Sequence, residues 1–130
     1  MGLVLDTNFI IAAERAARHN SAGPTDAFLA RHAAESFFIT FTVAGELACG
    51  RSASIRRDWE RLFKRYPVLP WTIEVAWFYG AIYRHLAAKG ALIGANDMWI
   101  AATALASGHG LVTNNIDEFR RIPDLRVETF

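Results

Sequence analysis

Short, unbroken runs of apolar residues alternate along the chain with longer stretches in which apolar residues recur every three or four positions. The first run, at residues 3–5, contains only branched aliphatic residues, which is typical of a strand buried on both faces in a parallel sheet. Similar runs make us expect further strands at residues 37–40, 67–70, 111–113 and 125–129, the last of them at an edge of the sheet.

The longer stretches have the periodicity of helices. In residues 54–66, Ile55, Trp59 and Leu62 fall on one helical face, and the opposite face is basic. We expect helices at residues 9–18, 24–34, 41–50, 54–66, 72–89 and 96–107, and a turn or short helix at residues 116–121. Strands that alternate with helices through short turns favour an α/β fold in which helices cover a parallel sheet.

Length, charge and cysteine content narrow the class of protein. A chain of 130 residues without repeats, low-complexity tracts or linkers predicts one domain over residues 1–130. The formal net charge of +1 does not by itself indicate a polyanionic partner. Cys49 is the single cysteine, which excludes an internal disulfide and fits a cytoplasmic protein. We see no secretion signal, and the longest uncharged run, residues 98–116, contains loop-forming glycines and asparagines that exclude a membrane span.

Polar residues follow the ends of the predicted strands. Asp6 comes directly after the first strand, Glu46 lies in the helix after the second, and Asp97 lies in the first turn of the helix before the fourth. Just past the fourth strand lie Asn114, Asn115, Asp117 and Glu118. If the first and fourth strands are neighbours, all these positions meet at one edge of the sheet, where ligands bind in open α/β folds.

Each acid also has a purely structural interpretation. Asp6 or Asn8 can cap the following helix, and Asp97 in a first helical turn is favourable to the helix dipole. Glu46 is different because its neighbours in the sequence are mostly uncharged, where a lone carboxylate is costly without a partner. Together, three carboxylates within ~4 Å would repel by ~4 kcal/mol per pair at an effective dielectric of about 20. A divalent cation would relieve that repulsion, and oxygen ligands favour Mg²⁺ or Mn²⁺ over zinc.

The motifs that hold these residues resemble a known family. They are LVLDTN at residues 3–8, TVAGELACG at 42–50, IGANDMWIA at 93–101, LVTNNIDEF at 111–119 and IPDLRVE at 122–128. In this order and at these separations the sequence resembles the PIN domain, and most closely the ribonuclease toxins of type II toxin–antitoxin pairs, the VapC-like group.

The resemblance implies a three-layer fold with a five-stranded parallel sheet, and a homodimer. It implies an endoribonuclease that depends on Mg²⁺ or Mn²⁺, acts on RNA and is blocked by a small cognate antitoxin. By resemblance, Asp6, Glu46 and Asp97 take the catalytic and metal-binding roles. Many PIN domains have a fourth acid where this chain has Asn115, so either Asn115 completes the site or Asp117 does, and the number of metals stays open.

Other residues could serve RNA or a partner. Thr7, Asn8 and Thr113 could orient water or phosphate, or simply form caps and turns. The basic residues of segment 51–65 could bind phosphate, or form a solvated face: Arg56, Arg57, Arg61, Lys64 and Arg65. Helical spacing favours core positions over base stacking for Trp59, Phe63 and Tyr66.

A second aromatic group is larger than one buried stripe needs, which suggests a dimer or antitoxin interface: Trp71, Trp77, Phe78, Tyr79 and Tyr83. The alternative to an enzyme is a non-catalytic PIN-like module that binds RNA or a protein. Its support is the missing fourth acid.

Overall fold

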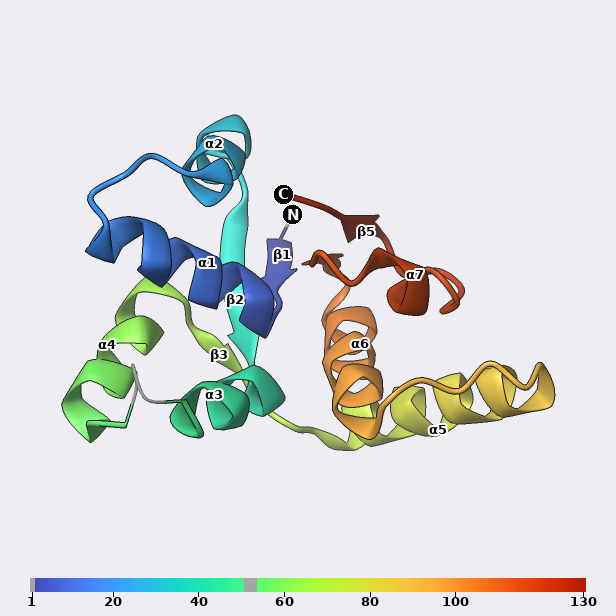
Figure 1. The fold of residues 1–130 in the computed structure, drawn as a ribbon. Helices are drawn as coiled ribbons and strands as arrows, with labels where there is room; N and C mark the ends of the chain where they lie inside the picture. The colour runs from blue at the N-terminus through green and yellow to red at the C-terminus, as the bar shows by residue number, and fades with distance from the viewer. Residues whose placement is uncertain (1, 51–53) are drawn as a thin grey trace.

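The computed structural model describes residues 2–50 and 54–130, and these form one five-stranded parallel sheet in the order β3-β2-β1-β4-β5 (Figure 1). The strands are β1 (Gly2–Leu5), β2 (Ser36–Thr40), β3 (Val68–Leu69), β4 (Gly110–Val112) and β5 (Val127–Glu128). The predicted fold class is confirmed. Because β1 pairs with β4, the condition for gathering the acidic residues at one edge is met.

Helices cover the sheet from both sides. They are α1 (Thr7–Arg18), α2 (Pro24–Arg31), α3 (Phe41–Ala48), α4 (Arg56–Arg65), α5 (Ile73–Ala88), α6 (Ala95–Ser107) and α7 (Ile116–Phe119). In Figure 1, α1 and α2 lie on one side of β1 and β2, and α5 and α6 lie on the other. Among the described residues no helix is long and apolar enough to cross a membrane.

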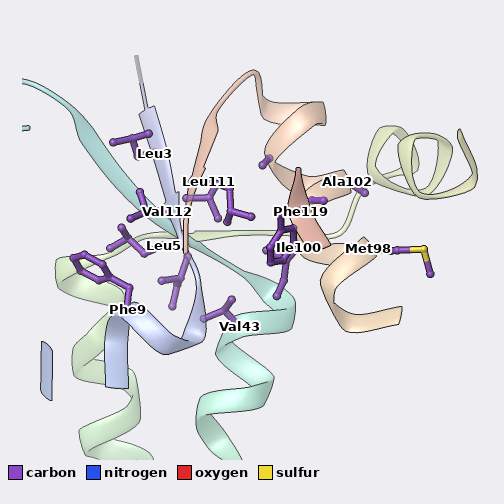
Figure 2. Packing of buried hydrophobic residues seen from close by; sticks show 14 of the residues in the cluster. Leu3, Leu5, Phe9, Val43, Met98, Ile100, Ala102, Leu111, Val112 and Phe119 are labelled. Carbon is purple, nitrogen blue, oxygen red and sulfur yellow. The ribbon is translucent and has the colours of Figure 1, made fainter. Parts of the chain in front are cut away.

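The core is centred on β1. Leu3, Val4 and Leu5 are all fully buried, because β1 lies in the middle of the sheet with helices on both sides. Figure 2 shows Leu3 and Leu5 together with Phe9 from α1 and Ile100 from α6, both of which are also fully buried. The central strand therefore holds the start of α1, which follows it directly, in a fixed position.

The edge strands are shorter than the sequence predicts. The fifth strand was expected over residues 125–129, but β5 has two residues. Asp124 adopts a left-handed conformation with φ of 65°, which turns the chain immediately before the strand. Beyond the ladder itself, the Leu111 amide donates to the carbonyl of Arg126 (2.8 Å), and the Thr113 amide donates to the carbonyl of Glu128 (2.9 Å).

One face of helix α4 packs against the rest of the fold, and the opposite face is exposed. Trp59 and Phe63 are half-buried, and Tyr66, directly after the helix, is 4% exposed. Their predicted core role is thus confirmed fully for Tyr66 and partly for the other two. Trp59 donates its indole N–H to the Ala44 carbonyl of α3 (2.8 Å), so α4 is tied to the helix that carries Glu46. Arg51, the first basic residue of this region, lies outside the described residues.

Candidate active site

Asp6 is held at the point where β1 ends and α1 begins. It is 6% exposed, and its backbone N–H donates to the Val112 carbonyl of β4 (3.0 Å). One carboxylate oxygen, Oδ1, accepts the Thr7 N–H (2.8 Å), and the other, Oδ2, accepts the hydroxyl of Thr113 (2.7 Å). The capping interpretation is therefore correct, but it accounts for only one of the two oxygens.

Thr113 fixes the orientation of Asp6. Its fully buried hydroxyl accepts the Asn8 side-chain N–H (3.2 Å) and the Asn115 backbone N–H (3.0 Å), so its own proton is left for Asp6. The side-chain carbonyl oxygen of Asn8 is buried and has no hydrogen-bond partner within residues 2–50 and 54–130. A buried polar atom of this kind is rare in folded proteins, and here it lies on a residue bonded to the site.

Glu46 reaches the same place from α3. That helix begins directly after β2, where the Thr40 hydroxyl accepts the Val43 N–H (3.0 Å). Glu46 is half-buried, and its Oε1 accepts the hydroxyl proton of Thr7 (2.8 Å). Thr7 thus connects the two acids, because its N–H binds Asp6 and its side chain binds Glu46.

Asp97 has the strongest electrostatic signature in the site. Burial raises its pKa to about 7, and the nearby charges of Asp6 and Glu118, a hydrogen bond with Glu118 and the charge of Glu46 all act in the same direction. Burial also raises the pKa of Asp6, with a smaller contribution from Glu46, against the hydrogen bonds from Thr113 and Thr7. The charges of four acids therefore interact: those of Asp6, Glu46, Asp97 and Glu118. No basic side chain is among the causes of the pKa shift of Asp6 or of Asp97.

The region after β4 brings in Glu118, to which the sequence analysis gave a position but no role. Asn115 caps α7 and donates its side-chain N–H to Oε2 of Glu118 (3.2 Å), while Asp117 is exposed. The structure thus turns Glu118 towards Asp97 and leaves Asp117 facing solvent. A sequence signal existed, because a polar cap followed three residues later by Glu is the pattern in which the Glu side chain folds back.

The donor set of this site fits a hard divalent cation. It consists of carboxylates and amide oxygens, with no imidazole or thiolate in the contacts given above. In the described part of the chain, no three acidic, histidine or cysteine side chains stand close enough to enclose an ion as they are oriented here. The reason is visible in the contacts, since Asp6 and Glu46 direct oxygens to the two threonines and Asp97 shares a hydrogen bond with Glu118.

Comparison with known proteins agrees with this arrangement. A family model described as the PIN domain matches residues 3–125. The chain belongs to the PIN-domain family. Ribonuclease VapC1 of Rickettsia felis is 32% identical, over 99% of this chain and 96% of the relative. A tRNA(fMet)-specific endonuclease VapC of Salmonella typhimurium is 41% identical over 53% of this chain and 52% of its own length.

Among solved structures, this PIN domain is similar to the toxin in the DNA-bound VapBC complex of Salmonella typhimurium. The TM-score is 0.82 and the sequence identity 30%, over 99% of this chain and 98% of the other. Within the PIN family the chain therefore belongs to the VapC-like group, as its motifs predicted. The roles of Asp6, Glu46, Asp97, Asn115 and Asp117 as ligands stay predictions.

Proposed function

We propose that this VapC-like PIN domain hydrolyses RNA phosphodiester bonds with a divalent cation, Mg²⁺ or Mn²⁺, held by Asp6, Glu46, Asp97 and Glu118. One observation carries the proposal: Asp97 has its pKa raised to about 7 by burial and by the other three acids. Like charges placed together in this way oppose folding, and a cation at their centre would turn the repulsion into attraction.

The residues of the chain prepare the reaction. A cation held there would lower the pKa of a bound water and polarise the scissile phosphate. Thr113 and Thr7 keep one oxygen of Asp6 and one of Glu46 in fixed positions. The side-chain carbonyl oxygen of Asn8, which has no hydrogen-bond partner among the described residues, could accept a hydrogen bond from a water in the site. In the hydrolysis the water oxygen bonds to phosphorus, the bond to the 3′ oxygen breaks, and the products carry a 5′ phosphate and a 3′ hydroxyl.

Glu118 replaces the two earlier candidates for the fourth acid. Asn115 would act on Glu118 through its side-chain N–H (3.2 Å), and Asp117 would remain in solvent. The non-catalytic alternative was supported by the absence of an acid at Asn115. It loses that support if Glu118, three residues further along the chain, supplies the fourth negative charge, as we propose. VapC-like PIN domains are endoribonuclease toxins neutralised by an antitoxin, and this chain is a member of that group. We place its action in the cytoplasm, where RNA and antitoxin would meet it.

Helix α4 is the surface that we propose for steering RNA. It carries five basic and two acidic side chains, and its basic residues are exposed. Arg56 binds Glu60 (2.6 Å) and Arg61 binds Asp58 (3.2 Å), whereas Arg57 and Lys64 have no ion pair to any residue the structure describes. Since Trp59 ties α4 to α3, the basic surface is connected to the helix that carries Glu46.

We also propose that the chain forms a homodimer. The group of aromatic and aliphatic side chains around the start of α5 supports this, because Trp71, Ile73 and Trp77 are 48%, 85% and 65% exposed. Trp71 stacks on Trp99 of α6, with ring centroids 4.4 Å apart, so part of this surface is rigid. Sedimentation velocity of the wild type and Trp77→Glu tests the proposal: the variant should be monomeric, and an unchanged dimer would exclude this surface.

The function is tested by a cleavage assay with purified protein and a set of defined RNAs. The initiator tRNA belongs in the set, because the Salmonella relative is named for it. We expect cleavage with Mg²⁺ or Mn²⁺, none with EDTA, and 5′-phosphorylated products. Binding of RNA without cleavage in any metal would favour the non-catalytic module instead.

A further inference from the structure

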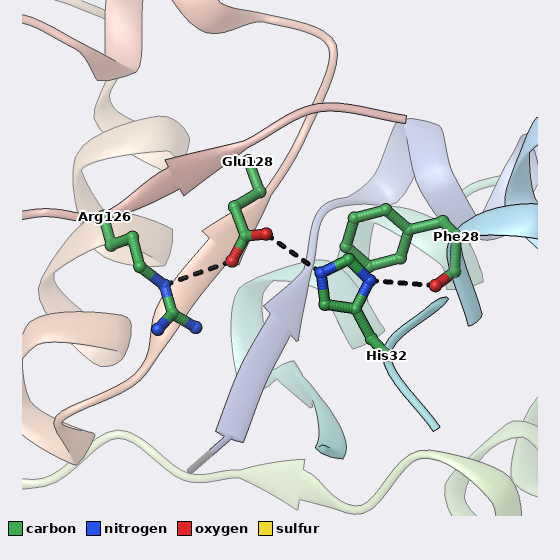
Figure 3. A network of polar contacts seen from close by, with 4 residues as sticks. All are labelled: Phe28, His32, Arg126 and Glu128. Atoms are coloured by element: carbon green, nitrogen blue, oxygen red, sulfur yellow. Dashed lines mark hydrogen bonds and ion pairs between the residues drawn. The ribbon is translucent and has the colours of Figure 1, made fainter. Parts of the chain in front are cut away.

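His32 lies at the end of α2, between that helix and the C-terminal strand β5 (Figure 3). Its ring nitrogen Nδ1 is 2.9 Å from the Phe28 carbonyl oxygen, and Nε2 is 3.1 Å from Oε1 of Glu128. The side chains of His32 and Glu128 are only 23% and 28% exposed. The second oxygen of Glu128 lies 3.1 Å from Nε of Arg126.

These contacts place the ring between two acceptors. The Phe28 carbonyl can only accept a hydrogen bond, and an ionised Glu128 can also only accept. Arg126 lies against the second oxygen of Glu128 and favours the negative charge of that carboxylate. A ring N–H donated to Glu128 is therefore a charge-assisted hydrogen bond. The ring also stacks on the Phe28 ring, with centroids 4.0 Å apart and planes 18° apart.

The same strand is bonded to the site on its other side. The backbone carbonyl of Glu128 accepts the Thr113 N–H (2.9 Å), and the Thr113 hydroxyl holds Oδ2 of Asp6 (2.7 Å). β5 is a two-residue edge strand with few bonds of its own to hold it. We propose that His32 is a positioning residue whose ring, bonded to Glu128, fixes β5 and thereby holds Thr113 and Asp6 in place. The fixing of β5 by His32 is independent of the proposed function, whereas its effect on catalysis through Asp6 rests on that function.

Amide hydrogen exchange tests the link to the site. At pH 6, His32→Gln should lower the protection factors of the Leu111 and Thr113 amides about tenfold, because a charge-assisted bond is lost. The Ile39 amide, which bonds to Pro67 at the opposite side of the sheet, should not change. Equal protection of Thr113 in variant and wild type would refute the proposal.

Two further variants separate the causes. His19 ends α1 as His32 ends α2, but it is exposed and makes no ion pair with any described residue, so His19→Gln should leave both amides unchanged. Glu128→Gln keeps an acceptor oxygen but removes the charge, so it should lower the protection of the same two amides. If β5 responds as expected but His32→Gln cleaves RNA at the wild-type rate, the link to Asp6 is wrong. If the wild type does not cleave RNA at all, the proposed function fails and the fixing of β5 remains.

Discussion

The half-buried carboxylates of Glu128 and Asp97 have opposite electrostatic surroundings: basic groups surround the first and acidic groups the second. Glu128 lies between two bases, with His32 at 3.1 Å from one oxygen and Arg126 at 3.1 Å from the other. Asp97 faces only acids, and burial together with those acids raises its pKa to about 7. The protein can evidently build a compensated environment for an acid, and it does so on the α2 side of β5.

The difference indicates what each region is for. A carboxylate with basic partners on both sides holds the fold together and needs nothing else. A group of acids without a base in contact is costly to the folded state until a cation joins it, so it is a functional feature rather than a stabilising one. The predictions below break or sharpen this contrast, beginning with the largest effect.

Removing Asp6 should have the largest effect on activity. Asp6→Ala takes away the most buried acid of the site, and we expect RNA cleavage to fall on the order of 10³-fold or more. The fold should survive, because one source of repulsion goes with the lost cap. Circular dichroism and cleavage of the same RNA measure both. A folded variant with wild-type activity would show that the acids are not the site. Glu128→Gln is the comparison from the other region: it reaches Asp6 only through β5 and Thr113, so it should lower cleavage far less than Asp6→Ala does.

The second prediction distinguishes the candidates for the fourth acid. Glu118→Gln keeps the shape of the side chain and should lower cleavage about 10- to 100-fold, because its charge lies beside Asp97. Asp117→Asn should cleave almost as the wild type does, since Asp117 is exposed. The reverse order of the two variants would restore Asp117 as the fourth acid.

The basic surface of α4 should have an intermediate effect, on binding rather than on chemistry. Replacing Arg57 and Lys64 with Glu should weaken RNA binding about tenfold and lower the slope of log K against log salt by about 2. The cleavage rate at saturating RNA should stay the same. A double replacement of Arg18 and Lys89 with Glu changes the net charge equally on other helices and serves as the control. Equal effects of the two double variants would mean that only the total charge matters.

Metal should stabilise the folded protein through the acids of the site and not through Glu128. Only the folded chain gathers the acids, so Mg²⁺ or Mn²⁺ at about 100 times its Kd would add about 2.7 kcal/mol. For a domain of this size that raises the melting temperature by several degrees. The gain should be lost in Glu46→Gln and kept in Glu128→Gln. A melting temperature that metal does not change in the wild type would contradict a metal site.

Periodicity and motif order were enough to predict the fold. The runs at residues 3–5 and 111–112 are short and apolar because both faces of the strands are covered, and that pattern is visible in the sequence. The length of β5 was not predictable in the same way. Its extent depends on the left-handed turn at Asp124 and on side-chain bonds from α2, which are distant in the sequence.

The site was predictable in position but not in detail. Asp6, Glu46 and Asp97 were expected at one edge, and the structure brings them within electrostatic reach of one another. The choice between Asn115, Asp117 and Glu118 depends on which way a four-residue helix faces. Four residues are too few to show which face of a helix is apolar. The only sequence signal was that Glu118 stands three residues after Asn115, the residue before the helix.

The smallest expected effect is a dependence of stability on pH in the metal-free protein. The folded-state pKa of Asp97, about 7, lies above the ordinary aspartate pKa of 3.8, so between these values the folded state binds more protons than the unfolded state. The contribution of Asp97 to stability is therefore complete below about pH 4 and is lost as the pH rises to about 7. Asp97→Asn carries no such charge. Its metal-free melting temperature should match the wild type at about pH 4, exceed it slightly at pH 5 and exceed it by a few degrees at pH 8, because solvent screens a half-buried group. Thermal melts of both proteins in EDTA measure the difference, and the four histidines, which both proteins share, contribute equally to the two curves. If Asp97→Asn were less stable than the wild type at pH 8, Asp97 would have a partner that compensates its charge, and the contrast with Glu128 would disappear.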